Sequence, residues 1–193
     1  MSRPLPLLIA AALALTLGAC SGSDEPDSET PLPTIESARN AELPVRPGDF
    51  CERIDERAVE AVVGEEPESA HYGNGEKAEI APGVTDVAHE FGCVFTSTTG
   101  SQARAWVAVP PVTAAQAAKI APGRKCTDAG VGLGEPGFAA TCTTKHGTTT
   151  TLAGLYTDTW FGCSLTEQEP TTTTTERLER WCAAAVQAAA TAD

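Results

Sequence analysis

The sequence is poor in basic residues and in aromatic residues. Its 193 residues include 13 lysines and arginines against 26 acidic residues, so the formal net charge is −13. A chain with this balance lacks the basic face that follows nucleic-acid phosphates, which excludes a nucleic-acid binder of that kind. Only 5% of the residues are aromatic, but 41% are hydrophobic. Part of the chain therefore has enough apolar side chains to bury a core, and the whole is not disordered.

No apolar run is long enough for a membrane-spanning helix. The longest lies at residues 5–17, after Arg3, and has 13 residues, whereas a spanning helix needs about 20. A positive start followed by a run of this length is typical of an export signal. The run ends in the letters LGAC at residues 17–20, which resemble the lipobox of bacterial lipoproteins. We therefore predict a lipoprotein signal peptide over residues 1–19 and lipidation of Cys20.

Residues 20–48 are predicted to be a lipidated, disordered tether. They are rich in serine, threonine, proline, aspartate and glutamate and contain few large apolar residues. Such a segment cannot bury enough surface to offset its chain entropy. With two or more acyl chains on Cys20, the lipid bilayer is the predicted partner and the extracytoplasmic face of the cell membrane the predicted location. Residues 49–193 remain as one extracellular domain.

This domain is predicted to be α+β. Helical spacing of apolar residues predicts a first helix with Asp49 as its N-cap, a short second helix and a C-terminal helix. The second and third are predicted to begin with capping boxes, at Thr113 with Gln116 and at Thr173 with Glu176. Alternating apolar residues predict strands near residues 91–95, 103–109, 138–142, 152–156 and 161–165.

Residues 65–88 lack periodicity and are interpreted as a loop. The resulting order is α-β-β-α-β-β-β-α. This order implies a single antiparallel sheet of about five strands with helices packed on one face.

Seven cysteines become an even set of six once Cys20 is assigned to lipidation. The six are Cys51, Cys93, Cys126, Cys142, Cys163 and Cys182. None has the C-x-x-C spacing of a zinc ribbon or a redox site, and export places the domain where disulfides persist. Three disulfides are therefore predicted, and no metal or cofactor. Many pairings are open; we favour the sequential one, which ties neighbouring elements: Cys51–Cys93, Cys126–Cys142 and Cys163–Cys182.

Few residues point to catalysis. Residues 132–137 match G-x-G-x-x-G by letter, but a dinucleotide fingerprint opens a helix, and here a predicted strand follows. No G-x-S-x-G, H-E-x-x-H or EF-hand spacing occurs. The histidines are His71, His89 and His146. We predict a protein that is not an enzyme; the alternative is a cell-envelope hydrolase built on Glu68, His71 and Asp86.

The acidic residues are concentrated in one part of the domain. Residues 52–90 hold 11 acidic and three basic residues, whereas residues 91–193 hold eight and seven. Several of them cover the first predicted helix and the segment after it: Glu52, Asp55, Glu56, Glu60, Glu65, Glu66 and Glu68. One interpretation is a solvated face that keeps the protein soluble. The other is a docking surface for a basic protein partner, another ligand or divalent cations.

The arrangement as a whole resembles a family of small, largely uncharacterised actinobacterial cell-surface lipoproteins that carry a domain of unknown function. The resemblance rests on Cys20 with its polar tether, on Phe50-Cys51 at the first predicted helix, on the GLGE segment at residues 132–135, and on Cys182 in an alanine-rich last helix. It implies a binding, accessory or sensor-like module at the cell envelope and transfers no catalytic residue. A purely structural surface protein is the second alternative to this function.

Overall fold

The computed structural model describes residues 30–120, 122–123 and 125–192. All the helices and strands described below belong to one compact unit, Pro31–Asp193. None of the helices in the described residues is long and apolar enough to cross a membrane.

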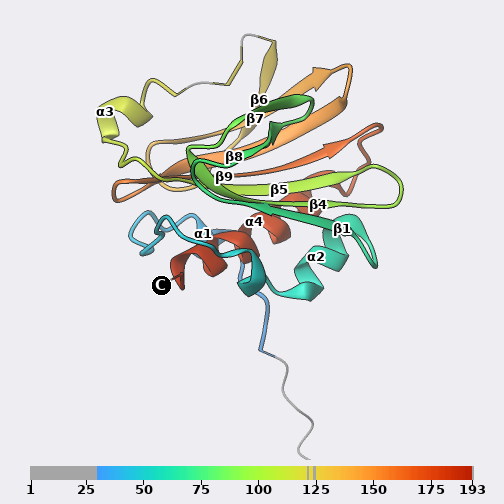
Figure 1. Ribbon diagram of the computed structural model, residues 1–193, viewed down its shortest axis with the longest axis horizontal. Coiled ribbons are helices and arrows are strands. Elements are labelled where there is room, and N and C mark those ends of the chain that lie inside the picture. The colour runs from blue at the N-terminus through green and yellow to red at the C-terminus, as the bar shows by residue number, and fades with distance from the viewer. Residues whose placement is uncertain (1–29, 121, 124, 193) are drawn as a thin grey trace, which may run out of the picture. The chain divides into compact units, whose positions relative to one another are not determined.

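A seven-stranded antiparallel sheet forms the centre of this unit, in the order β1-β4-β5-β9-β8-β7-β6 (Figure 1). Its strands are β1 (Glu68–Tyr72), β4 (Glu90–Thr96), β5 (Gln102–Ala108), β6 (Cys126–Gly130), β7 (Gly137–Thr144), β8 (Gly147–Tyr156) and β9 (Thr159–Glu167). β2 (Lys77–Ala81) and β3 (Val84–Val87) pair with each other in a separate hairpin. The α+β class and the antiparallel sheet are confirmed, but the predicted number and order of strands are wrong.

Four strands lie where the sequence analysis predicts none. β1, β2 and β3 fall within residues 65–88, so the prediction of a loop there is wrong. β6 also lies outside every predicted strand. Most of the side chains of β1, β3 and β6 are exposed, whichever way they point. Alternation of apolar residues arises when a strand buries at least one face, and these three strands therefore give no such signal.

The helices are α1 (Ile35–Ala38), α2 (Glu56–Val63), α3 (Ala114–Ala117) and α4 (Thr174–Ala190), with a 3-10 turn at Cys51–Arg53. α1 is not predicted, and α2 begins later than the predicted first helix. The prediction that Asp49 caps a continuous first helix is wrong. Asp49 accepts a hydrogen bond from the N–H of Cys51 at the 3-10 turn, and extended backbone at Ile54 interrupts the helix. Asp55 is the N-cap of α2.

The capping box of α3 is confirmed, but that of α4 is not formed. Thr113 and Gln116 accept hydrogen bonds from each other's backbone N–H. Thr173 has αR backbone angles, and its side chain caps no N–H group of α4 in the described residues. An N-cap side chain accepts from the N–H groups of the first turn when its own backbone is non-helical. Glu176 instead forms an ion pair with Arg180, one turn further along α4.

Residues 31–48 belong to the folded unit, so the prediction of a disordered tether over residues 20–48 is wrong for this part. α1 packs against α4, and both Ile35 and Val45 are buried in the core. A few apolar residues at suitable positions are enough for this, although the composition of the segment is polar. The predicted signal peptide, Cys20 and the first part of the tether lie outside the described residues.

One face of the sheet and three helices enclose the main core. α1, α2 and α4 lie on this helix-covered face (Figure 1). α3 departs from the prediction of helices on one face only, since Ala117 packs with Trp160 and Leu155, whose side chains leave the opposite face of the sheet. The β2–β3 hairpin also covers part of this opposite face, because residues of β2 and of the opposite face of β4 line one cavity.

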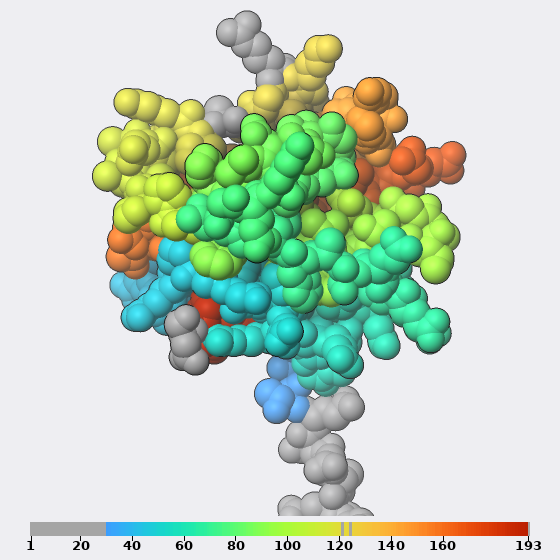
Figure 2. Space-filling model, in the orientation of Figure 1, coloured from blue at the N-terminus to red at the C-terminus, as the bar shows by residue number. Residues whose placement is uncertain are grey.

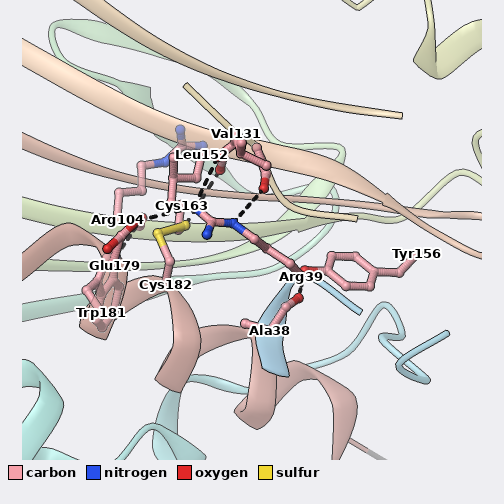
Figure 3. Close-up of a disulfide and its surroundings, with 11 residues drawn as sticks. Ala38, Arg39, Arg104, Val131, Leu152, Tyr156, Cys163, Glu179, Trp181 and Cys182 are labelled. Carbon is pink, nitrogen blue, oxygen red and sulfur yellow. Dashed lines mark hydrogen bonds and ion pairs between the residues drawn. A yellow bond between two sulfur atoms is a disulfide. The ribbon is translucent and has the colours of Figure 1, made fainter. Parts of the chain in front are cut away.

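Three disulfides are present, as the cysteine count predicts. They join Cys51 to Cys93, Cys126 to Cys142, and Cys163 to Cys182, which is the sequential pairing. The first ties the 3-10 turn to β4, the second joins β6 to β7, and the third ties β9 to α4 (Figure 3). Beside the third, Arg39 donates to the carbonyl of Val131 and pairs with Glu179 of α4, which attaches the segment after α1 (Figure 3).

The glycine-rich segment at residues 132–137 has a packing role. The carbonyl of Leu133 lies so close to β8 that a Cβ atom on Gly154 would be 1.4 Å from its oxygen. Leu133 itself is fully buried. β7 follows the segment, as the sequence predicts, so no helix N-terminus is available there for a dinucleotide phosphate.

Candidate functional site

Cavities flank the edge strand β1. The first, of about 360 Å³, lies between α2 and β1, and we call it the α2–β1 cleft. A second, of about 410 Å³, lies on the opposite face between β1, β4 and β2. A third, of about 240 Å³, lies at the end of β1 next to Asp49 and Glu76. His71 lines all three cavities, and Figure 2 shows the segment with α2 and β1, in cyan to teal, on the lower right of the surface.

The α2–β1 cleft combines an apolar floor with an acidic rim. Three side chains that are 6–8% exposed provide the floor: Ile54, Val59 and Phe95. The rim carries four carboxylates: Glu52, Glu56, Glu60 and Glu66. Ser69 and His71 of β1 close the other wall, and none of the lysines and arginines that the structure describes lines the cleft. The cleft therefore concentrates negative potential over a small apolar surface.

The local sequence explains how the carboxylates reach the rim. Asp55 begins α2 by accepting a hydrogen bond from the N–H of Arg57 at 2.9 Å, and the same carboxylate pairs with the Arg57 side chain. These hydrogen bonds from Arg57 hold the pKa of Asp55 below its usual value. With α2 fixed in this way, Val59 points into the cleft floor, and Glu56 and Glu60, one turn apart, share one side of the helix.

The four rim carboxylates are not used in the fold. Within the described residues, none of them forms a hydrogen bond or an ion pair through its side chain. Other carboxylates of the domain do have such partners: Glu90 pairs with Arg104, Glu167 with Arg177, and Glu179 with Arg39. In the folded domain, the rim therefore carries carboxylates that the described residues leave without a partner.

β1 has backbone groups free along its outer edge. The N–H of Ser97, just after β4, donates to the carbonyl of Ser101 at 2.8 Å, and the β4–β5 register places these two residues opposite each other. The odd-numbered residues of β4 are therefore the ones that bond to β5. Hydrogen bonds alternate along an antiparallel strand, so the even-numbered residues of β4 bond to β1. In the β1–β4 register, Ser69 and His71 stand opposite odd-numbered residues. Their N–H and C=O groups therefore point away from the sheet.

A buried polar network holds the end of β1 in place. The hydroxyl of Tyr72 donates to Glu90 at 2.8 Å and accepts from Arg104, whose guanidinium lies 4.2 Å from the centre of the Trp106 ring. Burial raises the pKa of Tyr72 to about 12. Because Tyr72 also covers Gly92 of β4, the edge strand is anchored although its outer side is exposed.

The structure brings one further group of potential metal ligands together. In the part of the chain that it describes, Asp49, Cys51 and His71 each place a ligand atom within 4.8 Å of the others. The sulfur of Cys51 is bonded to Cys93, so it has no thiolate to offer. One carboxylate and one imidazole remain, and these do not make a structural zinc site, which has four protein ligands.

The residues of the alternative hypothesis, a hydrolase, are not assembled. Glu68 and His71 are three residues apart on one strand, so their side chains leave opposite faces of the sheet. Asp86 lies on β3, where its carboxylate accepts from the N–H of Val87. None of the three cavities that His71 lines includes Glu68 or Asp86.

The other two histidines line none of the walls of the α2–β1 cleft. His89 is exposed just before β4, and His146 is exposed in the turn between β7 and β8. The ring of His146 lies against Gly83, at the turn of the β2–β3 hairpin. His146 therefore has a contact that positions the hairpin.

Sequence analysis found the acidic rim but missed the walls that make it a cleft. The concentration of carboxylates in residues 52–90 includes all four rim residues. Ser69 and Phe95 were not candidates, because β1 lacked a strand signal and Phe95 reads as an ordinary core residue. Comparison with known proteins gives no matching family model, no similar curated protein and no similar solved structure.

Proposed function

We propose that the protein is a lipoprotein anchored at the extracytoplasmic face of the membrane, and that its domain is a binding module for a cationic partner. The observation that carries this proposal is the α2–β1 cleft, in which four unpaired carboxylates surround an apolar floor. Lysine and arginine side chains match both features, because their aliphatic stems pack on apolar surface while their charged ends reach carboxylates.

Cationic side chains fit the cleft better than a divalent metal ion does. Calcium takes six to eight oxygen ligands that converge on one point. Among the described residues, no three of the four rim glutamates bring their carboxylates within 4.8 Å of one another. A spread of charge around an apolar floor suits several cationic groups, or one with a long stem.

Calorimetric titration of the full-length protein in detergent with an aliphatic tetraamine tests the binding activity. We expect saturable binding that weakens as salt is added, because the rim charges are exposed and screened. In the double variant Glu56→Gln/Glu60→Gln the affinity should fall by roughly tenfold, at about 0.5–1 kcal/mol per removed charge.

The matched control is Glu42→Gln/Glu169→Gln, which removes the same charge from two exposed positions outside the cleft. This variant should bind like the unchanged protein. Equal loss in both double variants would mean that net charge alone attracts the amine, and would contradict a site at the cleft.

Membrane anchoring has a separate test. The variant Cys20→Ser should release the protein from the membrane fraction into the medium or the periplasm, because acylation at this residue is the proposed anchor. Retention of Cys20→Ser in the membrane fraction at the level of the unchanged protein would contradict the lipoprotein assignment.

A further inference from the structure

The free edge of β1 and the cleft beside it form one continuous surface. Ser69 and His71 direct their backbone N–H and C=O groups outward, and the side chains of the same two residues line the α2–β1 cleft. These two residues offer two donors and two acceptors in the geometry that a further strand requires. In the described part of the chain, no other segment bonds to them.

We infer that β1 binds an extended segment of a partner protein by strand addition, and that this segment has lysine or arginine at every second position. The inference rests on the proposed function, since it names the cationic ligand of the same cleft. In this mode of recognition, backbone hydrogen bonds provide affinity and pockets on the two faces select alternate side chains.

The register of the sheet determines which side chains of the added strand meet the carboxylates. The added strand runs antiparallel to β1, as neighbouring strands do throughout the sheet. In an antiparallel pair, the residues that bond to Ser69 and His71 point their side chains to the same face as these two residues do. That face carries the α2–β1 cleft, so the lysines or arginines belong at these positions. The intervening residues point to the cavity on the opposite face, whose lining includes Lys77, Glu76 and Glu79. Both of these carboxylates already accept backbone N–H groups, Glu76 from Gly73 and Glu79 from Gly83, and Lys77 lies beside them. Unlike the α2–β1 cleft, that cavity therefore suits neutral side chains.

Charge decides between a basic segment and a second copy of this chain. Pairing two β1 strands would bring two acidic rims together, in a protein whose formal net charge is −13. Like charges placed close together across an interface are destabilising. The occupant with complementary charge is therefore a basic segment.

A set of short synthetic peptides tests the inference by titration into the full-length protein. The first alternates lysine and threonine; the second has the same composition with its lysines in one block. We expect the alternating peptide to bind roughly tenfold more tightly than the block peptide, because only the alternating sequence places every lysine on the cleft side.

Methylation of the peptide backbone separates strand addition from simple charge attraction. In the alternating peptide, the N–H groups of the lysines face β1 and those of the threonines face outward. N-methylation of the lysine amides should therefore abolish the advantage over the block peptide. N-methylation of the threonine amides is the matched control and should preserve it.

A matched pair of protein variants completes the test. Ser69→Pro removes one outward N–H but no hydrogen bond to β4, whereas Ser69→Ala removes only the hydroxyl. We expect Ser69→Pro to lose most of the preference for the alternating peptide, and Ser69→Ala to keep it. Circular dichroism of both variants establishes that any loss is not a failure to fold.

The outcomes distinguish the inference from the proposed function. Equal binding of all peptides and of the tetraamine would overturn strand addition while leaving a cationic binding site. Absence of binding by every peptide and by the tetraamine would overturn both. A dimer of the protein that Ser69→Pro dissociates would also overturn the inference, since it would show that a second copy occupies the edge.

Discussion

The two edges of the sheet are built differently. β6, at one edge, has a register shift between Asp128 and Gly130, and a disulfide joins Cys126 to Cys142 of its neighbour. β1, at the other edge, pairs with β4 through all five of its residues without a shift. Bulges are one device by which proteins prevent edge strands from pairing with other chains.

This difference indicates where the molecule can accept a partner. β6 is irregular, and the cavity of about 160 Å³ that reaches it is lined by one residue of the strand, Ala129. β1 is regular and has cavities on both faces, with charge as its protection against unwanted pairing. Acidic charge repels further copies of an acidic protein but attracts a basic segment. The same feature can therefore both prevent aggregation and select a partner.

Removing the disulfide at each edge gives the largest expected effects. Replacing Cys51 and Cys93 by alanine should lower the free energy of unfolding by about 4 kcal/mol, and replacing Cys126 and Cys142 by about 3 kcal/mol. The sequence separations of 42 and 16 residues set this order, because the longer loop loses more entropy in the unfolded chain. Urea denaturation measures both.

Only the first double replacement should also weaken binding, since Cys51 lines the α2–β1 cleft. A larger stability loss from the pair at β6 would contradict the entropic ordering. Equal loss of binding in both would remove the functional distinction between the edges.

Proline substitutions at neighbouring positions of β1 test its hydrogen-bond pattern. Ala70→Pro removes an N–H that bonds to β4 and should cost about 3 kcal/mol, by analogy with proline in other regular structure. Ser69→Pro removes an outward N–H and should change the free energy of unfolding by less than about 0.5 kcal/mol. Thermal unfolding of the two variants compares them directly. Similar costs would mean that the proposed alternation is wrong.

Loss of the cap on α2 should have a moderate effect. Asp55→Ala removes the side chain that accepts from the N–H of Arg57 and should cost about 1 kcal/mol. The effect should fade at acid pH: the pKa of Asp55 is lowered in the folded state, so its contribution is present above pH 3.8 and is lost as the pH falls through the folded value. Denaturation at neutral and acid pH measures this, and a cost that grows towards acid pH would contradict it.

The smallest effect is confined to alkaline pH. Tyr72 and Tyr156 are the two tyrosines of the chain, and burial raises the pKa of both, that of Tyr72 to about 12. Folded protein should therefore show little tyrosinate absorbance at pH 10, whereas unfolded protein should show about half-ionisation. The contribution of Tyr72 to the free energy of unfolding is fully present below pH 10 and is lost as the pH rises towards 12.

The Tyr72→Phe variant shows which part of the tyrosine titration comes from the edge strand. Its remaining tyrosine, Tyr156, should ionise only at still higher pH. Ionisation of Tyr72 near pH 10 in folded protein would show that β1 is not held against β4, and would weaken the account of the edge as a preformed binding surface.

The sequence predicts those strands and helices whose apolar residues recur at a regular spacing. The hairpin of β4 and β5 follows from the alternation of Phe91, Cys93 and Phe95, and α4 from its apolar stripe. β1 has no such alternation because four of its five residues are exposed. The segment with α1 looks like a linker by composition, yet Ile35 and Val45 are buried, since burial depends on position rather than on average polarity.

The candidate site could be predicted only in part, for a related reason. The acidic residues stand out in the sequence because charge is visible without a structure. The cleft needs Phe95 and His71 to come together with α2 from separate elements, and the free edge depends on which strand ends the sheet. Both are consequences of topology, which no local pattern in residues 52–90 specifies.

Hydrogen exchange at individual backbone amides tests the central claim most directly. Exchange of the Ser69 and His71 amides in full-length protein should be fast, because these groups face solvent, and the alternating lysine peptide should slow it markedly. The Glu68 and Ala70 amides, already bonded to β4, should change little. Protection confined to β6 or to α4, or unchanged exchange at Ser69 and His71 in protein saturated with the peptide, would contradict binding at the β1 edge.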